Sequence, residues 1–202
     1  MVVTIRIAKE SDANAVLNIY KPYVEKTAIT FDYDIPSLEN FKNRMKDIQS
    51  RYPFLVAEES GVILGYSYAA PFHPRAAYAW SCEVSIYLEE SCRGRGIGQQ
   101  LYQSLESYLR QMGFLNLNAC LASSSIETPY LTQASQHFHE KLGFKKVGTF
   151  HHSGYKFQHW FDMIWMEKMI GEHTRQVTLP KSIHDILDLH QKEESDENTC
   201  HR

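Results

Sequence analysis

The chain has 202 residues, of which 43% are hydrophobic and 22% are charged, and its formal net charge is −3. These values are ordinary for a globular protein, and the length suits one domain with an appendage. The weak negative charge excludes a protein that attracts nucleic acid through its overall field, so we expect no nucleic-acid partner.

Cysteine spacing and apolar runs narrow the class further. Cys82, Cys92, Cys120 and Cys200 show no paired C-x-x-C spacing, so neither a structural zinc site nor a disulfide framework is expected. The first residues lack the basic segment and apolar run of a signal peptide, and no apolar run approaches the roughly 20 residues of a membrane span. We therefore expect a cytoplasmic protein with reduced thiols and no membrane contact.

Periodicity in the first half of the chain predicts one strand, two helices and then three strands. Alternating β-branched and aromatic residues are typical of strands, and apolar residues at every third or fourth position are typical of helices. In chain order we predict a strand at 2–8, helices at 13–24 and 36–48, a hairpin at 54–58 and 62–69, and a third antiparallel strand at 79–88.

The segment from 83 to 112 contains the most informative pattern. A strand-like run at 84–88 leads into the hexapeptide RGRGIG at 93–98, and an amphipathic helix follows. Glycines let a backbone turn tightly and approach a ligand closely. A helix start presents free N–H groups and the positive end of the helix dipole. The segment therefore predicts an anion site, for which a phosphate is the natural ligand.

Two common phosphate loops do not fit this spacing. Counted from Gly94, the dinucleotide fingerprint G-x-G-x-x-G ends at Gln99 and not at a glycine. A triphosphate loop needs Gly-Lys-Ser/Thr, and no such triplet follows Gly98. The pattern Arg93-x-x-Gly96-x-Gly98 instead resembles the pyrophosphate signature of GCN5-related N-acetyltransferases (GNATs), which hold acetyl-coenzyme A. A glycine-rich connection without a ligand is the alternative.

The second half of the chain predicts the rest of the sheet. We predict a strand at 115–121, a helix at 131–142, and a strand pair at 145–150 and 162–168 separated by a loop that contains Gly154. The order β-α-α-β-β-β-α-β-α-β-β predicts an α/β protein whose mixed sheet has helices on its faces. The GNAT acyl-CoA N-acyltransferase fold has the same order, so the resemblance and the periodicity agree.

The composition changes after residue 171. Residues 182–189 have apolar side chains at helical spacing and predict a short amphipathic helix. Residues 192–202 are polar and acidic, and we predict that they are disordered. The chain is therefore divided into an N-acetyltransferase domain at 1–171 and a C-terminal extension at 172–202.

Two segments resemble phosphinothricin N-acetyltransferases in particular. They are PFHPRAAYAWSCE at 71–83 and GYKFQHWFD at 154–162. In that subfamily the glutamate matching Glu83 is the presumed general base, and the arginine matching Arg75 lies near the amino-acid substrate. An arginine fork suits a carboxylate or phosphinate. A solvated strand-edge Glu83 and a surface Arg75 are the alternatives without function.

Acetyl transfer from a thioester to an amine needs a base, a stabilised oxyanion and a proton for the leaving thiolate. A partly apolar pocket would raise the pKa of Glu83 and suit it to the first task. Many GNATs have a thiolate-protonating tyrosine where this chain has His139, and a histidine suits that role near neutral pH. A plain helix-surface position is the alternative for His139. No metal is predicted, because His151 and its neighbouring histidines lack partners at ligand spacing.

The resemblance also implies the residues that bind the two substrates. Those expected to hold acetyl-CoA are Ile86, Tyr87, Leu88, Arg93, Gly94, Arg95, Gly96, Ile97, Gly98, Gln99 and Thr132. Those expected to contact the acceptor are Phe31, Tyr33, Arg75, Tyr78 and Tyr155. Packing alone explains the aromatic residues almost as well. Thr132 stands where the family usually has asparagine, so it keeps a hydroxyl but lacks the amide.

These patterns together predict an acetyl-CoA-dependent N-acetyltransferase. Its acceptor would be a small amino-acid-like amine of the phosphinothricin or methionine sulfoximine type, acetylated directly with Glu83 as the general base. The resemblance further implies a homodimer. Two alternatives stay open, namely an acetyltransferase of a polyamine, antibiotic or protein amine, and a coenzyme-A-binding module without turnover.

Overall fold

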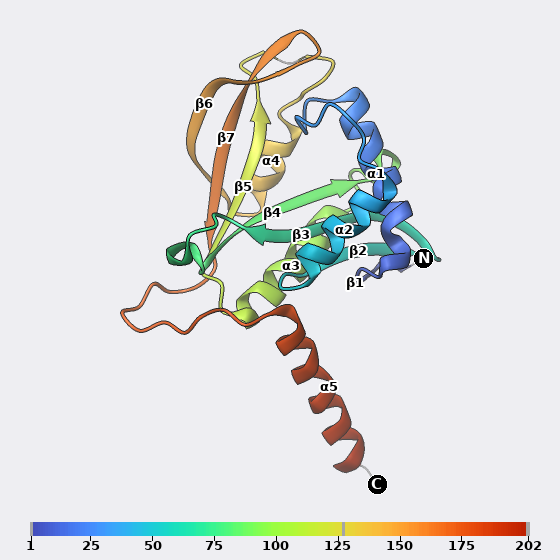
Figure 1. Ribbon diagram of the computed structural model, residues 1–202, viewed down its shortest axis with the longest axis vertical. Helices are drawn as coiled ribbons and strands as arrows, with labels where there is room; N and C mark the ends of the chain where they lie inside the picture. Colours follow the sequence, from blue (N-terminus) through green and yellow to red (C-terminus); the bar gives the residue numbers. More distant parts are fainter. Residues whose placement is uncertain (1, 127, 201–202) are drawn as a thin grey trace.

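The computed structural model describes residues 2–126 and 128–200 (Figure 1). For residues 193–200 it describes the backbone alone. The strands are β1 (Thr4–Ile7), β2 (Phe54–Glu59), β3 (Val62–Pro71), β4 (Ser81–Leu88), β5 (Asn116–Ser123), β6 (Lys145–Lys156) and β7 (His159–Met169). The α-helices are α1 (Ala13–Lys26), α2 (Leu38–Gln49), α3 (Ile97–Met112), α4 (Ala134–Lys141) and α5 (Ile183–Cys200). Three short 3-10 helices are η1 (Glu10–Asp12), η2 (Ala76–Tyr78) and η3 (Glu90–Cys92). The predicted element order is confirmed.

All strands belong to one seven-stranded sheet in the order β1-β2-β3-β4-β5-β7-β6. Neighbouring strands are antiparallel except for β4 and β5, which are parallel. The predicted mixed sheet is therefore confirmed. Within the described ranges, no helix is long and apolar enough to cross a membrane.

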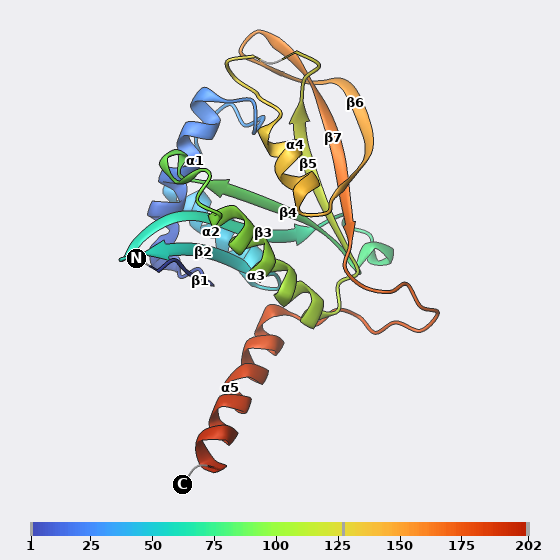
Figure 2. The same cartoon turned by 180° about the vertical axis from the view of Figure 1, so that it is seen from behind.

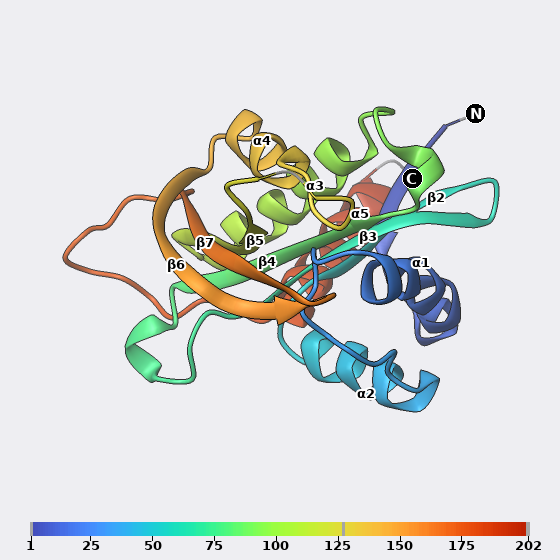
Figure 3. The same ribbon diagram turned by 90° about the horizontal axis from the view of Figure 1, so that it is seen from above.

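The two faces of the sheet carry separate hydrophobic cores. Helix α3 packs on one face, against a core that includes Cys82 and Val84 of β4. Helices α1 and α2 pack on the other face, with Tyr66 and Tyr68 of β3. Figure 3 shows α3 and α4 on one side of the sheet and α1 and α2 on the other. Because successive strand side chains point to opposite faces, Glu83 faces α1 and α2.

Strands β4 and β5 pair only where they begin. Their ladder contains Ser81–Asn116, Cys82–Leu117 and Glu83–Asn118 and then ends. Figures 1 and 2 show the two strands diverging beyond this point. The side-chain amide of Asn118 donates to the carbonyl of Cys82 at 3.2 Å and closes the base of the opening. The sheet is thus split at its centre, between the helices of its two faces.

The β6–β7 hairpin corrects the predicted boundaries. Both strands are longer than predicted, and Gly154 lies in β6 and not in a loop. Only Phe157 and Gln158 separate the strands, with φ angles of 51° and 61°. Gly154 resembled a loop residue, but its role is close approach: a Cβ there would lie 2.4 Å from the Phe31 ring. The register shifts between Phe150 and Gly154, so a bulge absorbs the irregular sequence.

The end of the chain also differs from the prediction. A helix does begin where predicted, and Ile183 and Ile186 are buried in the core that contains α3. The helix continues to Cys200, through residues predicted to be disordered, and projects away from the sheet (Figure 1). Lysine and glutamate have high helix propensity, so a docked first turn lets the acidic segment extend the helix.

Candidate active site

The opening between β4 and β5 leaves one edge of β4 unpaired. Leu88 belongs to this edge, and its N–H and carbonyl both bond the hydroxyl of Tyr23, at 3.1 and 2.6 Å. The carbonyl of Cys82, already bonded from β5, belongs to it too. Every second residue of a strand presents its main chain to the same edge, so Val84 and Ile86 lie there as well. The β4–β5 ladder ends at the parallel pair Glu83–Asn118, which uses the N–H of Val84 and leaves the Val84 carbonyl and the main chain of Ile86 open.

This edge refines the predicted main-chain contacts for acetyl-CoA. Ile86 is on the open edge, whereas Leu88 is already bonded by Tyr23. The main chain of Tyr87 is directed to β3, where it pairs with Tyr66. The sequence analysis missed Val84, although alternation from Ile86 would have identified it. An extended ligand arm would find the carbonyl of Val84 and both main-chain groups of Ile86.

The glycine-arginine turn precedes the first turn of α3. Gly94 and Gly96 have φ angles of 78° and 76°, in the left-handed region that favours glycine. A Cβ at either position would meet nothing within 4 Å, so the two glycines serve backbone conformation and not packing. The first helical bond runs from the N–H of Gln100 to the carbonyl of Gly96 at 3.1 Å. The N–H groups of 97–99 are therefore left for an anion.

The two arginines of the turn differ in their contacts. Arg95 Nη2 donates to both carboxylate oxygens of Glu59, at 2.8 and 2.9 Å, and so ties the turn to the β2–β3 hairpin. The side chain of Arg93 is exposed and makes no hydrogen bond or ion pair with the described residues. Arg93 is therefore the cation of the turn that is available to a ligand.

The third glycine of the signature is constrained by packing. A Cβ on Gly98 would lie 3.1 Å from the Phe138 ring of α4 and 3.3 Å from Leu88. This close approach sets the start of α3 against both α4 and β4. Thr132 lies just before α4, where its hydroxyl accepts a hydrogen bond from the N–H of Ala134 at 3.4 Å. Its expected contact with the coenzyme stays a prediction.

His139 lies inside the molecule and not on a helix surface. Its side chain is buried, and burial lowers its pKa. The carbonyl oxygen of Ser135 lies 2.8 Å from Nδ1 of His139. Because a carbonyl oxygen can only accept a hydrogen bond, the ring proton sits on Nδ1. Nε2 then accepts from the hydroxyl of Tyr102 at 3.1 Å. The role of His139 as proton source stays a prediction, and in this arrangement Tyr102 is its only side-chain hydrogen-bonding partner among the described residues.

A pocket of about 550 Å³ lies on the other face of the sheet, between α2 and strands β3 and β4. Glu83 lines it, and burial raises the pKa of its carboxyl group above the ordinary value, against the opposing charge of Arg44. The other polar side chains on its wall include Asn40, Asn43, Arg44, Asp47 and Tyr68. The sequence analysis missed these residues of α2 and β3.

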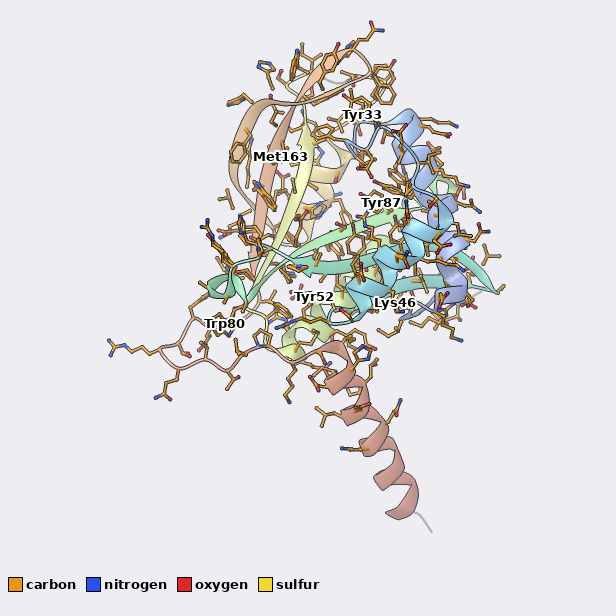
Figure 4. The ribbon with its side chains drawn as sticks, viewed as in Figure 1. Tyr33, Lys46, Tyr52, Trp80, Tyr87 and Met163 are labelled. Carbon is orange, nitrogen blue, oxygen red and sulfur yellow. The ribbon has the colours of Figure 1, made fainter. Side chains whose placement is uncertain are left out.

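The predicted acceptor residues fall into two groups. Phe31, Tyr33 and Tyr155 meet where the α1–α2 connection contacts β6, and the Tyr33 hydroxyl donates to the carbonyl of Tyr155. Arg75 and Tyr78 lie on the β3–β4 connection, at the other end of β4. Figure 4 shows Tyr33 at the top of the molecule and Trp80, close after Tyr78, at the lower left. Neither group lines the pocket that contains Glu83.

Other chemistry has little support in the described part of the chain. It contains no group of three or more histidine, cysteine, aspartate or glutamate side chains placed to hold a metal ion. Cys82, Cys92 and Cys120 are free thiols there. Burial raises the pKa of the Cys82 thiol, so its thiolate is disfavoured. The opening, the turn and the Glu83 pocket are therefore the candidate active site.

Comparison with known proteins identifies the class. A family model described as an acetyltransferase (GNAT) domain matches residues 5–165. The chain therefore belongs to the GNAT acetyltransferase family. The matched range lies inside the predicted domain at 1–171.

Within this family, the chain is similar to several named acetyltransferases. Phosphinothricin N-acetyltransferase from Streptomyces viridochromogenes is 32% identical over 161 residues, which cover 80% of this chain and 84% of the relative. L-methionine sulfoximine/L-methionine sulfone acetyltransferase from Pseudomonas aeruginosa is 31% identical over 170 residues, which cover 83% and 94%. A phosphinothricin acetyltransferase from Sinorhizobium meliloti, solved with AcCoA, has a TM-score of 0.79 at 31% identity, covering 90% of this chain and 100% of that chain. These relatives support an N-acetyltransferase enzyme.

Proposed function

We propose that this enzyme transfers the acetyl group of acetyl-CoA to the amino group of a small amino-acid-like acceptor, of the phosphinothricin or methionine sulfoximine type. The observation that carries the proposal is the split in the sheet. It lies between the glycine-arginine turn at the start of α3 and the pocket lined by Glu83. Donor and acceptor would meet at β4, and such positioning removes the need for a covalent intermediate.

The donor side would recognise acetyl-CoA mainly through main-chain groups. The N–H groups of 97–99 and the side chain of Arg93 suit a pyrophosphate. The open edge at Val84 and Ile86 suits the amide-containing arm, which would add to β4 like a strand. Acetyl-CoA supplies an activated thioester carbonyl when it is bound there.

Glu83 would accept the proton of the acceptor's ammonium group, directly or through one water. The freed amine then attacks the thioester carbonyl carbon, and the N–H of Ile86 on the open edge of β4 stabilises the charge on the carbonyl oxygen. The C–S bond breaks, and the departing thiolate takes up a proton. Water can supply that proton, because the one O–H of Tyr102 is donated to His139 Nε2, and the role of His139 in this step stays a prediction.

A polyamine acceptor is the second candidate, because Asp47 shares the pocket wall with Glu83. Two acidic side chains would favour a substrate with more than one ammonium group. The homodimer and the cytoplasmic location are not tested by these observations and stay predictions.

Thiol release from acetyl-CoA tests the proposal. The wild-type enzyme is assayed with L-phosphinothricin, L-methionine sulfoximine, L-methionine sulfone and spermidine. We expect turnover with the amino acids, and a loss of about 10²- to 10⁴-fold in kcat for Glu83→Gln. Glu25→Gln, at an exposed site on α1, is the matched control and should keep full activity. Turnover of spermidine alone, or an unchanged kcat in Glu83→Gln, would contradict the proposal.

A further inference from the structure

Arg44 is the one basic residue on the wall of the Glu83 pocket, as far as the described residues go. It belongs to α2, whereas Glu83 belongs to β4, so the pocket holds opposite charges on facing elements. Among the described side chains, Arg44 makes no ion pair and no hydrogen bond to a carboxylate. A guanidinium with unused donors beside a reactive carboxylate indicates a ligand that carries both charges.

Tyr68 holds the guanidinium in place. Arg44 Nη2 donates to the Tyr68 hydroxyl at 2.6 Å, and its Cζ lies 5.6 Å from the centre of the Tyr68 ring. Tyr68 is buried, so this anchor is fixed by the sheet. One of the five N–H donors of Arg44 is used in this contact, and the others stay available for a planar anion.

The register of β3 and β4 relates this anchor to Glu83. Tyr68 pairs with Ser85, and Ala70 pairs with Glu83, so Tyr68 and Glu83 are diagonal neighbours on one face. Diagonal side chains on neighbouring strands are within reach of one another through a small ligand. Arg44 and Glu83 are therefore placed to hold the two ends of one small zwitterion.

We propose that Arg44 binds the carboxylate of the acceptor and makes the enzyme selective for α-amino acids over amines that lack this group. This inference rests on the proposed function and names its substrate class. Asn40, one turn before Arg44 on α2, and Asn43, directly before it, supply further amide donors on the same wall. Asp47 on that wall would repel the carboxylate, so the position of the anion is restricted to the Arg44 end of the pocket.

A pair of acceptors that differ only in the carboxylate tests this. They are L-methionine sulfone and its decarboxylated amine, 3-(methylsulfonyl)propylamine. We expect Arg44→Gln to lower kcat/KM for the amino acid about 10- to 100-fold and to leave that for the amine within about 3-fold. Arg44→Lys, which keeps the charge without the fork, should fall between wild type and Arg44→Gln.

Two further variants serve as comparisons. Lys46, labelled in Figure 4, belongs to the same helix but lines a different hollow. Lys46→Gln therefore removes a positive charge outside the Glu83 pocket and should leave kcat/KM unchanged for both acceptors. Arg75→Gln tests the other candidate for the carboxylate, on the β3–β4 connection. Equal losses for both acceptors in Arg44→Gln, no loss at all, or a selective loss in Arg75→Gln alone would overturn the inference.

Calorimetric binding of L-methionine sulfone separates this inference from the proposed function. If the wild type acetylates neither acceptor, the proposed function fails. The binding measurement then decides about Arg44: binding that is lost in Arg44→Gln supports it, whereas absent binding or equal binding by both proteins overturns it. Far-UV circular dichroism and thermal melting confirm that each variant is folded, as expected for an exposed side chain.

Discussion

The two sides of the split in the sheet are built from different parts of the chain. On the donor side, the groups that we propose for recognition are mainly main-chain N–H groups of one continuous segment, shaped by Gly94, Gly96 and Gly98. On the acceptor side, they are side chains from separate elements, with Arg44 on α2 and Glu83 on β4. The donor side therefore depends on backbone conformation, and the acceptor side depends on which side chains meet.

This difference predicts how substitutions act. Changes to the donor-side glycines should alter backbone placement, and with it both stability and the KM for acetyl-CoA. Changes on the acceptor side should alter the choice and reactivity of the amine with little effect on acetyl-CoA. The following predictions test this division, from the largest expected effect to the smallest.

Gly98→Val should give the largest loss of stability. The added Cβ would lie 3.1 Å from Phe138, and overpacking of this kind costs about 1–3 kcal/mol. We expect a lower free energy of unfolding in urea and a KM for acetyl-CoA raised at least tenfold, because α3 is displaced. Gly148→Val is the matched control, since a Cβ at Gly148 meets nothing within 4 Å. Equal effects of the two substitutions would show that the close approach to Phe138 is unimportant.

Arg93→Ala should raise the KM for acetyl-CoA about 10-fold or more and leave the melting temperature unchanged, because its side chain has no partner in the described protein. Arg95→Ala is the comparison: it loses the contact with Glu59 and should affect acetyl-CoA less. The measurement is steady-state kinetics with acetyl-CoA varied. A larger KM effect in Arg95→Ala would reverse the assignment of the two arginines.

Glu83→Gln should stabilise the fold slightly while it removes activity. Burial raises the pKa of Glu83, so the folded state favours its protonated form. The stability contributed by this group is present below its unfolded pKa and is lost as the pH rises through the folded pKa. At pH 7 the neutral glutamine avoids that loss, and the melting temperature should rise. A fall at pH 7 would show that the ionised carboxylate stabilises the fold.

Glu106→Gln should change stability in the opposite direction. Burial opposes the shift, but hydrogen bonds from Lys168 and Arg110 lower the pKa of the Glu106 carboxyl group. Its stabilising contribution is therefore present above the unfolded pKa and is lost as the pH falls through the folded pKa. At pH 7 the melting temperature should fall, and the difference from wild type should shrink in acid. A constant difference between pH 7 and pH 3 would contradict this.

The donor side was predictable because its signal is contiguous. The spacing of 93–98 after a strand and before a helix specifies a turn, a helix start and free N–H groups without any knowledge of the rest of the sheet. Even there, the sequence did not distinguish Arg93 from Arg95. Their difference depends on Glu59, which the antiparallel β2–β3 hairpin brings to the turn.

The acceptor side was predictable only in part. Glu83 was identified through the resemblance of 71–83, whereas Arg44 stands in an ordinary amphipathic helix beside the apolar Met45. Its importance depends on which face of the sheet α2 covers and on the contact with Tyr68, 24 residues later. Helical periodicity indicates that a face is buried but not what it faces.

The remaining differences have local physical causes. The sequence around Gly154 predicted a loop. Gly154 instead lies in β6, where the absence of a Cβ leaves room for the Phe31 ring to pack against the strand. The acidic end predicted disorder from composition, but docking of Ile183 and Ile186 against α3 starts a helix that then continues. In both places a tertiary contact outweighed the local signal.

The pH profile of kcat/KM tests the central claim, that Glu83 is the base in a pocket across β4 from the donor site. The wild type and Glu83→Gln are compared from pH 5 to 9, with acetyl-CoA saturating and the concentration of L-methionine sulfone varied. In the wild type, kcat/KM should fall toward acid through a single ionisation whose pKa lies above that of an ordinary glutamate. That limb should be absent from the residual activity of Glu83→Gln. The same limb in both proteins would contradict the account.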